Sequence, residues 1–254
     1  LIGASVFGMD DVYAKLKPYV RRVRASAAAG EPLPPLFFVS VDIKKCFDSV
    51  KHDKLMEIIE SVLGEDEYRI GRYTTVIQSE GRLRRFFHRD VDACERHEQV
   101  RQLVARLSRL HRAAVLADQR HVVYERREGL LALLSEHVLA NLVRIGGDVY
   151  RQARGISQGS VLSSLLCAYF YGDLEGAVVG EVGDKGLVMR LIDDFLLITH
   201  ERRVAHGFLH AMHRGVEEYG CEINRSKTKT NFGVSRTTAP PEWYGRAGDL
   251  LEGS

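Results

Sequence analysis

The sequence predicts a fold that combines α-helices with antiparallel β-strands. Residues 36–43 form a short apolar run rich in aromatic and β-branched side chains, which is typical of a buried strand. Two more apolar runs flank Asp193 and Asp194 within residues 187–199, which predicts a β-hairpin with these two aspartates as its turn. Elsewhere apolar residues recur at helical spacing. The 254-residue chain has 45% hydrophobic residues and a net charge of +2, so its composition is globular and its charge does not demand a nucleic-acid partner.

In the N-terminal part of the chain, one helix is predicted before the first strand and one after it in sequence. Residues 9–24 are expected to form an amphipathic helix kinked at Pro18, and the turn-prone residues 25–35 then break regular structure. A second helix is predicted from about residue 53 to residue 63, where the apolar residues at helical spacing are Leu55, Ile58, Ile59 and Val62.

Residues 80–145 differ in character and predict a mainly helical insertion. They carry 13 arginines against 9 acidic residues, together with five of the ten histidines. The charges either form a solvated face, which is the commoner case, or contact RNA or DNA. Two apolar stripes at helical spacing support the prediction: Val100, Leu103, Val104, Leu107 and Leu110, then Leu131, Leu134, Val138 and Leu142.

The remaining elements follow the insertion. Residues 155–159 are predicted to form a loop, and Ser160 can cap a helix over residues 161–171. After the hairpin, residues 202–219 are predicted to be helical, and residues 221–232 form a polar loop that leads into a strand.

Several classes of protein are excluded by simple signals. The four cysteines show neither a CxxC pair nor zinc-ligand spacing, so they are expected to be reduced and packed. No apolar run approaches the roughly 20 residues of a membrane span. The chain begins with Leu1 rather than an initiator methionine, and we therefore expect a piece of a longer protein.

Three carboxylates interrupt apolar β-segments. Asp42 lies within the first strand, and Asp193 with Asp194 lies between the two runs of the hairpin. A carboxylate in a buried run costs several kcal/mol unless something compensates its charge. A lone strand aspartate is more often hydrogen-bonded, and an aspartate pair is often only a turn. The joint pattern favours a shared divalent cation, and carboxylate oxygens are the ligands that Mg²⁺ prefers.

Five stretches of the sequence resemble motifs of reverse transcriptases. They are residues 41–49 (first catalytic motif), 152–175 (second palm motif), 191–199 (hairpin of the paired aspartates), 219–232 (the motif that follows) and 243–245 (start of the primer grip). Three details resemble the telomerase branch: Phe195 follows the aspartate pair, the segment between Asp42 and Gln158 is long, and residues 3–11 are similar to the stretch before the first motif.

The resemblance implies an α+β reverse-transcriptase palm with a small antiparallel sheet packed by helices, plus the mainly helical insertion. Residues 1–79 would be the first part of the palm, residues 80–145 the insertion in fingers, and residues 146–245 the second part up to the primer grip. Residues 246–254 would be a tail. The fingers motifs, RNA-binding domain and thumb of the family would lie outside this chain, so we expect the isolated chain to be weak or inactive.

The resemblance also assigns roles to individual residues. Two Mg²⁺ ions would be held by Asp42, Ile43, Asp193 and Asp194. The nucleotide would contact Ile43, Phe47, Gln158, Gly159 and Lys227. In this set Phe47 would be a steric gate against ribonucleotides, although a phenylalanine at a strand end is otherwise a core residue. Lys227 would act on the pyrophosphate leaving group. The primer end would contact Trp243, Tyr244 and Gly245, where Tyr244 departs from the usual cysteine.

The implied function is that of a telomerase RNA-directed DNA polymerase, acting in the nucleus at telomeres. Its partners would be a telomerase RNA template, a single-stranded telomeric DNA primer, deoxynucleotides and other holoenzyme proteins, with no membrane. Two alternatives remain at this point: a retroelement reverse transcriptase, which the long insertion argues against, and a non-catalytic fragment that binds nucleic acid or a partner.

Overall fold

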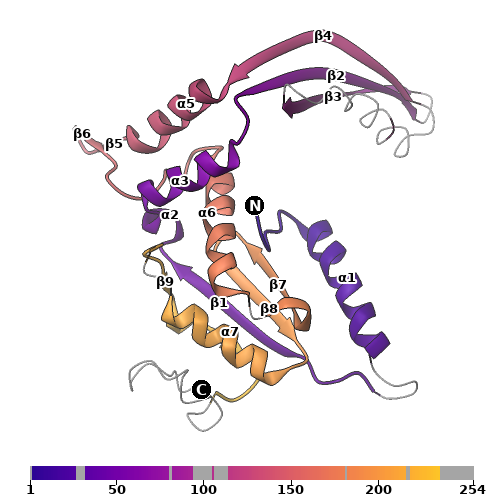
Figure 1. Ribbon diagram of the computed structural model, residues 1–254, viewed down its shortest axis with the longest axis vertical. Helices are drawn as coiled ribbons and strands as arrows, with labels where there is room; N and C mark the ends of the chain where they lie inside the picture. Colours follow the sequence, from indigo (N-terminus) through magenta and orange to yellow (C-terminus); the bar gives the residue numbers. More distant parts are fainter. Residues whose placement is uncertain are drawn as a thin grey trace. The chain divides into compact units, whose positions relative to one another are not determined.

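The computed structural model describes residues 2–26, 32–79, 82–93, 105, 114–180, 182–215 and 218–234. The chain divides into two compact units, of which one comprises Leu1–Ile58 with Val138–Ser254 and the other comprises Ile59–His137. Both contain helices and antiparallel strands (Figure 1), so the predicted α+β class is confirmed. No helix in the described part of the chain is long and apolar enough to span a bilayer.

The first unit is built on an antiparallel sheet of five strands. Its main path runs in the order β10-β1-β8-β7, and β9 pairs with the far end of β1. The first strand and the hairpin are confirmed where the apolar runs predicted them. The strands are β1 (Phe37–Lys44), β7 (Gly186–Leu191), β8 (Asp194–Thr199), β9 (Glu222–Ile223) and β10 (Lys229–Thr230).

Helices cover the two faces of this sheet unequally. Helices α6 and α7 lie together over one face, and α1 packs against the other face beside β7 (Figure 1). Short helices α2 and α3 follow β1. The helices are α1 (Met9–Ser26), α2 (Cys46–Ser49), α3 (His52–Val62), α6 (Ser163–Val178) and α7 (Arg202–Arg214), with 3₁₀ turns η1 (Gly183–Lys185) and η2 (Arg225–Lys227).

The alternation of side chains along β1 and β8 separates core from site. Val39 and Val41 pair with Leu197 and Phe195, and all four are almost fully buried in the core. Successive strand residues point to opposite faces. The intervening residues of β1, Ser40 and Asp42, therefore lie on the opposite face, where part of the sheet lines an open pocket.

The second unit contains a three-stranded antiparallel sheet of order β3-β2-β4 with a register shift between Gly71 and Tyr73. The strands are β2 (Glu67–Ser79), β3 (Arg82–Ala93) and β4 (Ala114–Arg126). Helix α5 (Arg127–Leu139) follows β4 and ends in the first unit, which also holds the hairpin of β5 (Leu142–Ile145) and β6 (Asp148–Arg151).

The prediction that the insertion is mainly helical is wrong for the described residues. Only α5 is a long helix there, and the segments on either side of the undescribed part are strands. The reason is visible in β3, where arginines occupy both faces and Leu83 and Phe87 are exposed. A strand with no buried face lacks the two-residue alternation that identifies it. The stripe from Val100 to Leu110 lies outside the described residues apart from Ala105, and Leu142 of the second stripe belongs to β5.

Two predicted helix ends also shift. The helix after Ser160 begins at Ser163 and continues to Val178, and the Ser160 hydroxyl accepts the N–H of Leu162 just before it. Helix α7 ends at Arg214 because Gly215 adopts a φ of 68° and a ψ of −177°, an extended conformation at positive φ that is essentially confined to glycine. The division of the chain at residues 79 and 145 remains a prediction.

Candidate active site at the end of β1 and β8

The three predicted aspartates lie at one end of the sheet. Asp42 and Asp194 are direct partners in the β1–β8 register, and Asp193 is in the turn that precedes β8. The main chain fixes this end further. The Ile43 N–H donates to the carbonyl of Asp193 across 3.2 Å, and the Asn224 N–H donates to the carbonyl of Asp42 across 2.8 Å. Strand β1, the hairpin of β7 and β8, and the polar loop after α7 therefore converge on the same point.

The hairpin turn is formed one residue earlier than predicted. Leu191 pairs with Asp194, so the two turn residues are Ile192 and Asp193 rather than the two aspartates. Ile192 has a φ of 59°. A β-branched residue in this left-handed region costs about 1–3 kcal/mol and persists only where its surroundings hold it. As a result Asp194 belongs to the strand, on the same face as Asp42.

Lys227 supplies the positive charge at this end. Its Nζ atom donates to Asp42 Oδ1 across 3.0 Å, and the Asp42 residue is only 9% exposed. The hydrogen bond raises the pKa of Lys227, which keeps the ammonium charged. Burial raises the pKa of Asp193, and the charges of Asp194 and Asp42 add to the increase against the opposing effect of Lys227. Burial is thus the main cause of the raised pKa of Asp193, and the two neighbouring aspartates add to it.

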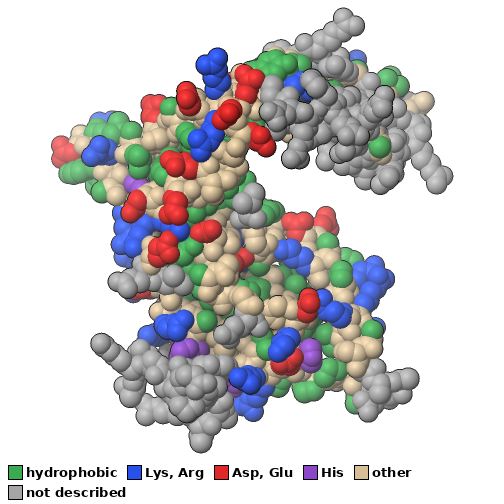
Figure 2. All heavy atoms as spheres, viewed as in Figure 1, with side chains coloured by type: hydrophobic (Ala, Val, Ile, Leu, Met, Phe, Trp, Pro, Cys, Tyr) green, Lys and Arg blue, Asp and Glu red, His purple; other side chains and the backbone are tan. Residues whose placement is uncertain are grey.

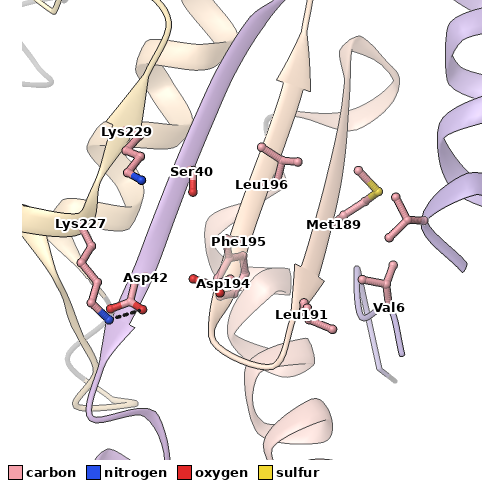
Figure 3. A pocket seen from close by; sticks show the side chains of 11 residues that line it. Val6, Ser40, Asp42, Met189, Leu191, Asp194, Phe195, Leu196, Lys227 and Lys229 are labelled. Carbon is pink, nitrogen blue, oxygen red and sulfur yellow. Dashed lines mark hydrogen bonds and ion pairs between the residues drawn. The ribbon is translucent and has the colours of Figure 1, made fainter. Parts of the chain in front are cut away.

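A pocket of about 550 Å³ opens beside Asp42, Asp194 and Lys227, and Asp193 is not among the residues that line it (Figure 3). Its volume falls within the range of about 300–1,000 Å³ that is usual for small-molecule sites. Ser40 and Lys229 also line it, and neither residue was predicted. The polar lining is formed by Ser40, Asp42, Asp194, Lys227 and Lys229, and the apolar lining by Val6, Val12, Met189, Leu191, Phe195 and Leu196.

The predicted nucleotide loop docks beside Phe47. Lys45 adopts a left-handed conformation that turns the chain from β1 into α2, where Phe47 is half-buried. The Phe47 carbonyl accepts the N–H of Ile156 across 2.9 Å. Gly155 has a φ of 78°, and a Cβ atom there would lie 2.7 Å from both the Phe47 carbonyl oxygen and the Asp48 Cα. Only glycine allows this close approach of the two backbones.

The remaining predicted site residues either are exposed or lie outside the described residues. Gln158 and Gly159 are exposed in the same loop. Trp243, Tyr244 and Gly245 lie outside the described residues. A residue that sequence reasoning missed is Arg190, a fully buried charge of the apolar strand β7. The signal for it was the one that identified Asp42, a charge within an apolar run.

The candidate ligands of the site are chemically suited to Mg²⁺, but their side chains are not arranged around an ion. All its candidate donors are oxygens, and the raised pKa of Asp193 reflects burial together with neighbouring negative charge that a cation would offset. Among the residues that the structure describes, however, no three His, Cys, Asp or Glu side chains are grouped so as to hold an ion. The Lys227 ammonium is hydrogen-bonded to Asp42, so a cation that binds Asp42 would compete with it.

Known proteins resemble this chain in both sequence and fold. It is 40% identical over 239 residues to the telomerase reverse transcriptase of Bos taurus and 38% identical over 240 residues to that of Canis lupus familiaris. Each alignment covers 92% of this chain and 21% of the relative, so the chain spans about a fifth of their length. A comparison with protein-family models gives no match.

Two solved structures share the fold. A telomerase from Candida albicans, in complex with a TWJ fragment of telomeric RNA, matches with a TM-score of 0.63 at 22% identity, over 94% of this chain and 33% of that chain. An apo telomerase from Candida tropicalis, truncated from its C-terminal domain, matches with a TM-score of 0.60 at 16% identity, over 91% and 37% of the two chains. Over 92% of its length the chain is therefore similar in sequence to part of the telomerase reverse transcriptases of Bos taurus and Canis lupus familiaris, and it shares its fold with the two Candida telomerases.

Proposed function

We propose that this chain is the catalytic palm region of a telomerase, an RNA-directed DNA polymerase that extends chromosome 3′ ends by copying an RNA template. The observation that carries the proposal is the direct pairing of Asp42 with Asp194, with Asp193 in the adjoining turn. Three carboxylates at one sheet end suit in-line phosphoryl transfer assisted by two metal ions.

In the proposed reaction Asp42, Ile43, Asp193 and Asp194 would hold two Mg²⁺ ions. When bound, the ions would lower the pKa of the primer 3′-hydroxyl and stabilise the charge on the leaving pyrophosphate. The hydroxyl attacks the α-phosphate of the deoxynucleotide, and the bond to pyrophosphate breaks. The residues that line the pocket would orient the primer 3′-hydroxyl and the deoxynucleotide, and their charged side chains would set the electrostatic potential there.

Lys227 has two successive roles in this proposal. In the absence of metal its ammonium offsets the charge of Asp42. The lysine side chain is 63% exposed, so it can leave Asp42 for an incoming triphosphate. There its Nζ would stabilise the pyrophosphate leaving group or donate a proton to it.

The nucleotide and primer contacts are proposed on the same basis. Phe47 would exclude a ribose 2′-hydroxyl, and its backbone is held by the loop of Gly155 that leads to Gln158 and Gly159. Trp243, Tyr244 and Gly245 would support the primer end. We retain residues 1–79 and 146–245 as the two parts of the palm, residues 80–145 as the insertion in fingers and residues 246–254 as a tail.

The partners proposed for the whole protein are a telomerase RNA template, a single-stranded telomeric primer, deoxynucleotides and other holoenzyme proteins, in the nucleus at telomeres. The Candida albicans telomerase in complex with telomeric RNA supports the RNA partner. In Figure 2 positive and negative side chains are interspersed over the visible face of the described residues, in line with the net charge of +2. Strong nucleic-acid contacts are therefore expected from other parts of the protein as well.

The test uses the full-length protein purified with its endogenous RNA. A single-stranded telomeric primer, Mg²⁺ and deoxynucleotides are supplied without an added template, and Asp42→Ala is compared with Glu222→Gln. Glu222 is an exposed carboxylate on neighbouring β9, so its loss controls for a general change of charge. A ladder of repeats that persists in Glu222→Gln, and that Asp42→Ala and RNase both abolish, supports the proposal.

Two other outcomes point to the alternatives. Copying that requires both Asp42 and an added RNA template, without a ladder from the endogenous RNA, would indicate a retroelement polymerase. Absence of both activities in a folded protein would favour the non-catalytic alternative, a fragment that binds nucleic acid or a partner.

A further inference from the structure

Beneath the hairpin that carries the paired aspartates lies a buried guanidinium. Arg190 is the fifth residue of β7 and is 1% exposed. Its Nε donates to Glu175 Oε1 of α6 across 2.5 Å. Its Nη2 donates to the Ser5 hydroxyl across 2.6 Å and to the Ala168 carbonyl across 3.0 Å. A buried charge of this kind is tolerated only when it is paired and its donors are used.

One donor of Arg190 reaches the turn itself. Nη1 donates to the carbonyl of Ile192 across 3.0 Å. Ile192 is the turn residue with a φ of 59°, and Asp193 follows it directly. The guanidinium therefore holds the peptide that joins the left-handed isoleucine to Asp193.

The N-terminal segment covers this cluster and closes it. The Val6 N–H donates to the carbonyl of Arg190 across 2.8 Å, and the Arg190 N–H donates to the carbonyl of Ala4 across 3.0 Å. The Ala4 N–H donates to the second carboxylate oxygen of Glu175. Gly3 lies so close that a Cβ atom there would be 1.8 Å from the same oxygen. Arg190 thus joins the N-terminal segment and α6 to one turn.

We propose that Arg190, oriented by Glu175, is a positioning residue that fixes the Ile192–Asp193 turn and thereby sets where the Asp193 carboxylate binds metal. The inference rests on the proposed function for the metal but concerns residues that the polymerase roles above leave unused. A purely structural ion pair would behave differently, because neutral or apolar groups can replace a buried pair with little loss of stability.

The experiment compares three variants of the full-length protein assembled with its RNA. Arg190→Lys keeps the charge but cannot make the same set of hydrogen bonds. Arg190→Met combined with Glu175→Gln removes both charges and keeps an acceptor for the Ala4 N–H. The matched control is Thr199→Val at the opposite end of the same hairpin. It removes two hydrogen bonds of the Thr199 hydroxyl, which donates to the Lys185 carbonyl and accepts the Glu201 N–H.

Three quantities are measured for each variant: the thermal unfolding midpoint, the Mg²⁺ concentration for half-maximal primer extension, and Mn²⁺ affinity from electron paramagnetic resonance. We expect both Arg190 variants to need about tenfold or more metal, because residues that orient metal ligands typically have effects of this size. Thr199→Val should lower the midpoint without moving the metal requirement. Unchanged metal affinity in the Arg190 variants, or an equal change in Thr199→Val, would overturn the proposal.

Two further variants keep the test decisive. If Arg190→Lys does not fold, Glu175→Gln, which retains Arg190 but weakens its orientation, should still raise the metal requirement above that of the control. Adding Ile192→Gly to Arg190→Lys should recover part of the lost affinity, since glycine adopts a positive φ without support. If the wild type fails to extend primers but binds Mn²⁺ in an Asp193-dependent way, the polymerase assignment fails while the binding measurement still decides the role of Arg190. Absence of Asp193-dependent Mn²⁺ binding in the wild type would contradict the inference itself.

Discussion

Lys227 holds Asp42 through a hydrogen bond of 3.0 Å between Nζ and Oδ1 (Figure 3). The Asp42 side chain is 12% exposed and the Lys227 side chain is 63% exposed, so one partner is fixed in the sheet and the other borders solvent. Lys227 therefore acts as a replaceable counter-ion for the buried Asp42 carboxylate, which would otherwise lack a compensating charge.

Replacing Lys227 with methionine is expected to lower the rate of nucleotide addition about hundredfold or more, the usual range for loss of a general acid. The fold should persist because the lysine is exposed. Single-turnover primer extension measures the rate. Lys227→Arg retains the positive charge but not an easily transferred proton, so an equally low rate in the two variants would support proton donation, whereas a rate restored in Lys227→Arg would assign the effect to the loss of charge.

Replacing Asp193 with alanine is expected to abolish nucleotide addition and leave the metal-free fold intact. The substitution removes a carboxylate whose pKa is raised by burial and by Asp194 and Asp42, and it thus relieves repulsion. Primer extension and thermal denaturation without metal measure the two effects. A large drop of the unfolding midpoint in the metal-free variant would contradict this account of the site.

The raised pKa of Asp193 also predicts a pH dependence of stability. The folded protein holds this proton more tightly than the unfolded chain, so the free energy of unfolding decreases as pH rises from the ordinary carboxyl value through the raised one. Asp193→Asn lacks the ionisation. Its stability relative to the wild type should therefore increase over that window, measured by metal-free denaturation from about pH 3 to about pH 8, a range that starts below the ordinary carboxyl pKa. A difference that is constant with pH would show that Asp193 does not titrate as argued.

Gly155→Ala is expected to destabilise the protein by about 1–3 kcal/mol, the usual cost of a strained backbone position. The added Cβ would meet the Phe47 carbonyl and the Asp48 Cα at 2.7 Å, and φ is 78°. Gly159→Ala in the same loop is the control, since a Cβ there meets nothing within 4 Å. Denaturant unfolding of both variants tests the difference, and equal stabilities would exclude the close approach of the loop to α2.

Phe47→Ala is expected to relax discrimination against ribonucleotides, because the smaller side chain leaves room for a 2′-hydroxyl. The ratio of kcat/KM for a deoxynucleotide and the matching ribonucleotide measures this directly. An unchanged ratio, with the protein folded, would assign Phe47 to core packing alone.

The sequence predicted the site better than the second unit, for physical reasons. Asp42 and the hairpin were found because β1 and β8 bury one face, and a charge is conspicuous in an apolar run. Strand β3 was missed because its exposed arginines and aromatics leave no alternation, and its pairing with β2 depends on main-chain hydrogen bonds that any sequence can make. The left-handed Ile192 could not be predicted either, because support for that conformation comes from Arg190 in the neighbouring strand.

The alternation along β1 links correct folding to a functional site. Val41 and Ile43 belong to the core, and Asp42 between them belongs to the pocket. A shift of β1 by one residue would exchange the two faces, so the aspartate would enter the core and the apolar residues would leave it. Such a chain would lose the packing of its core and the pairing of Asp42 with Asp194 together.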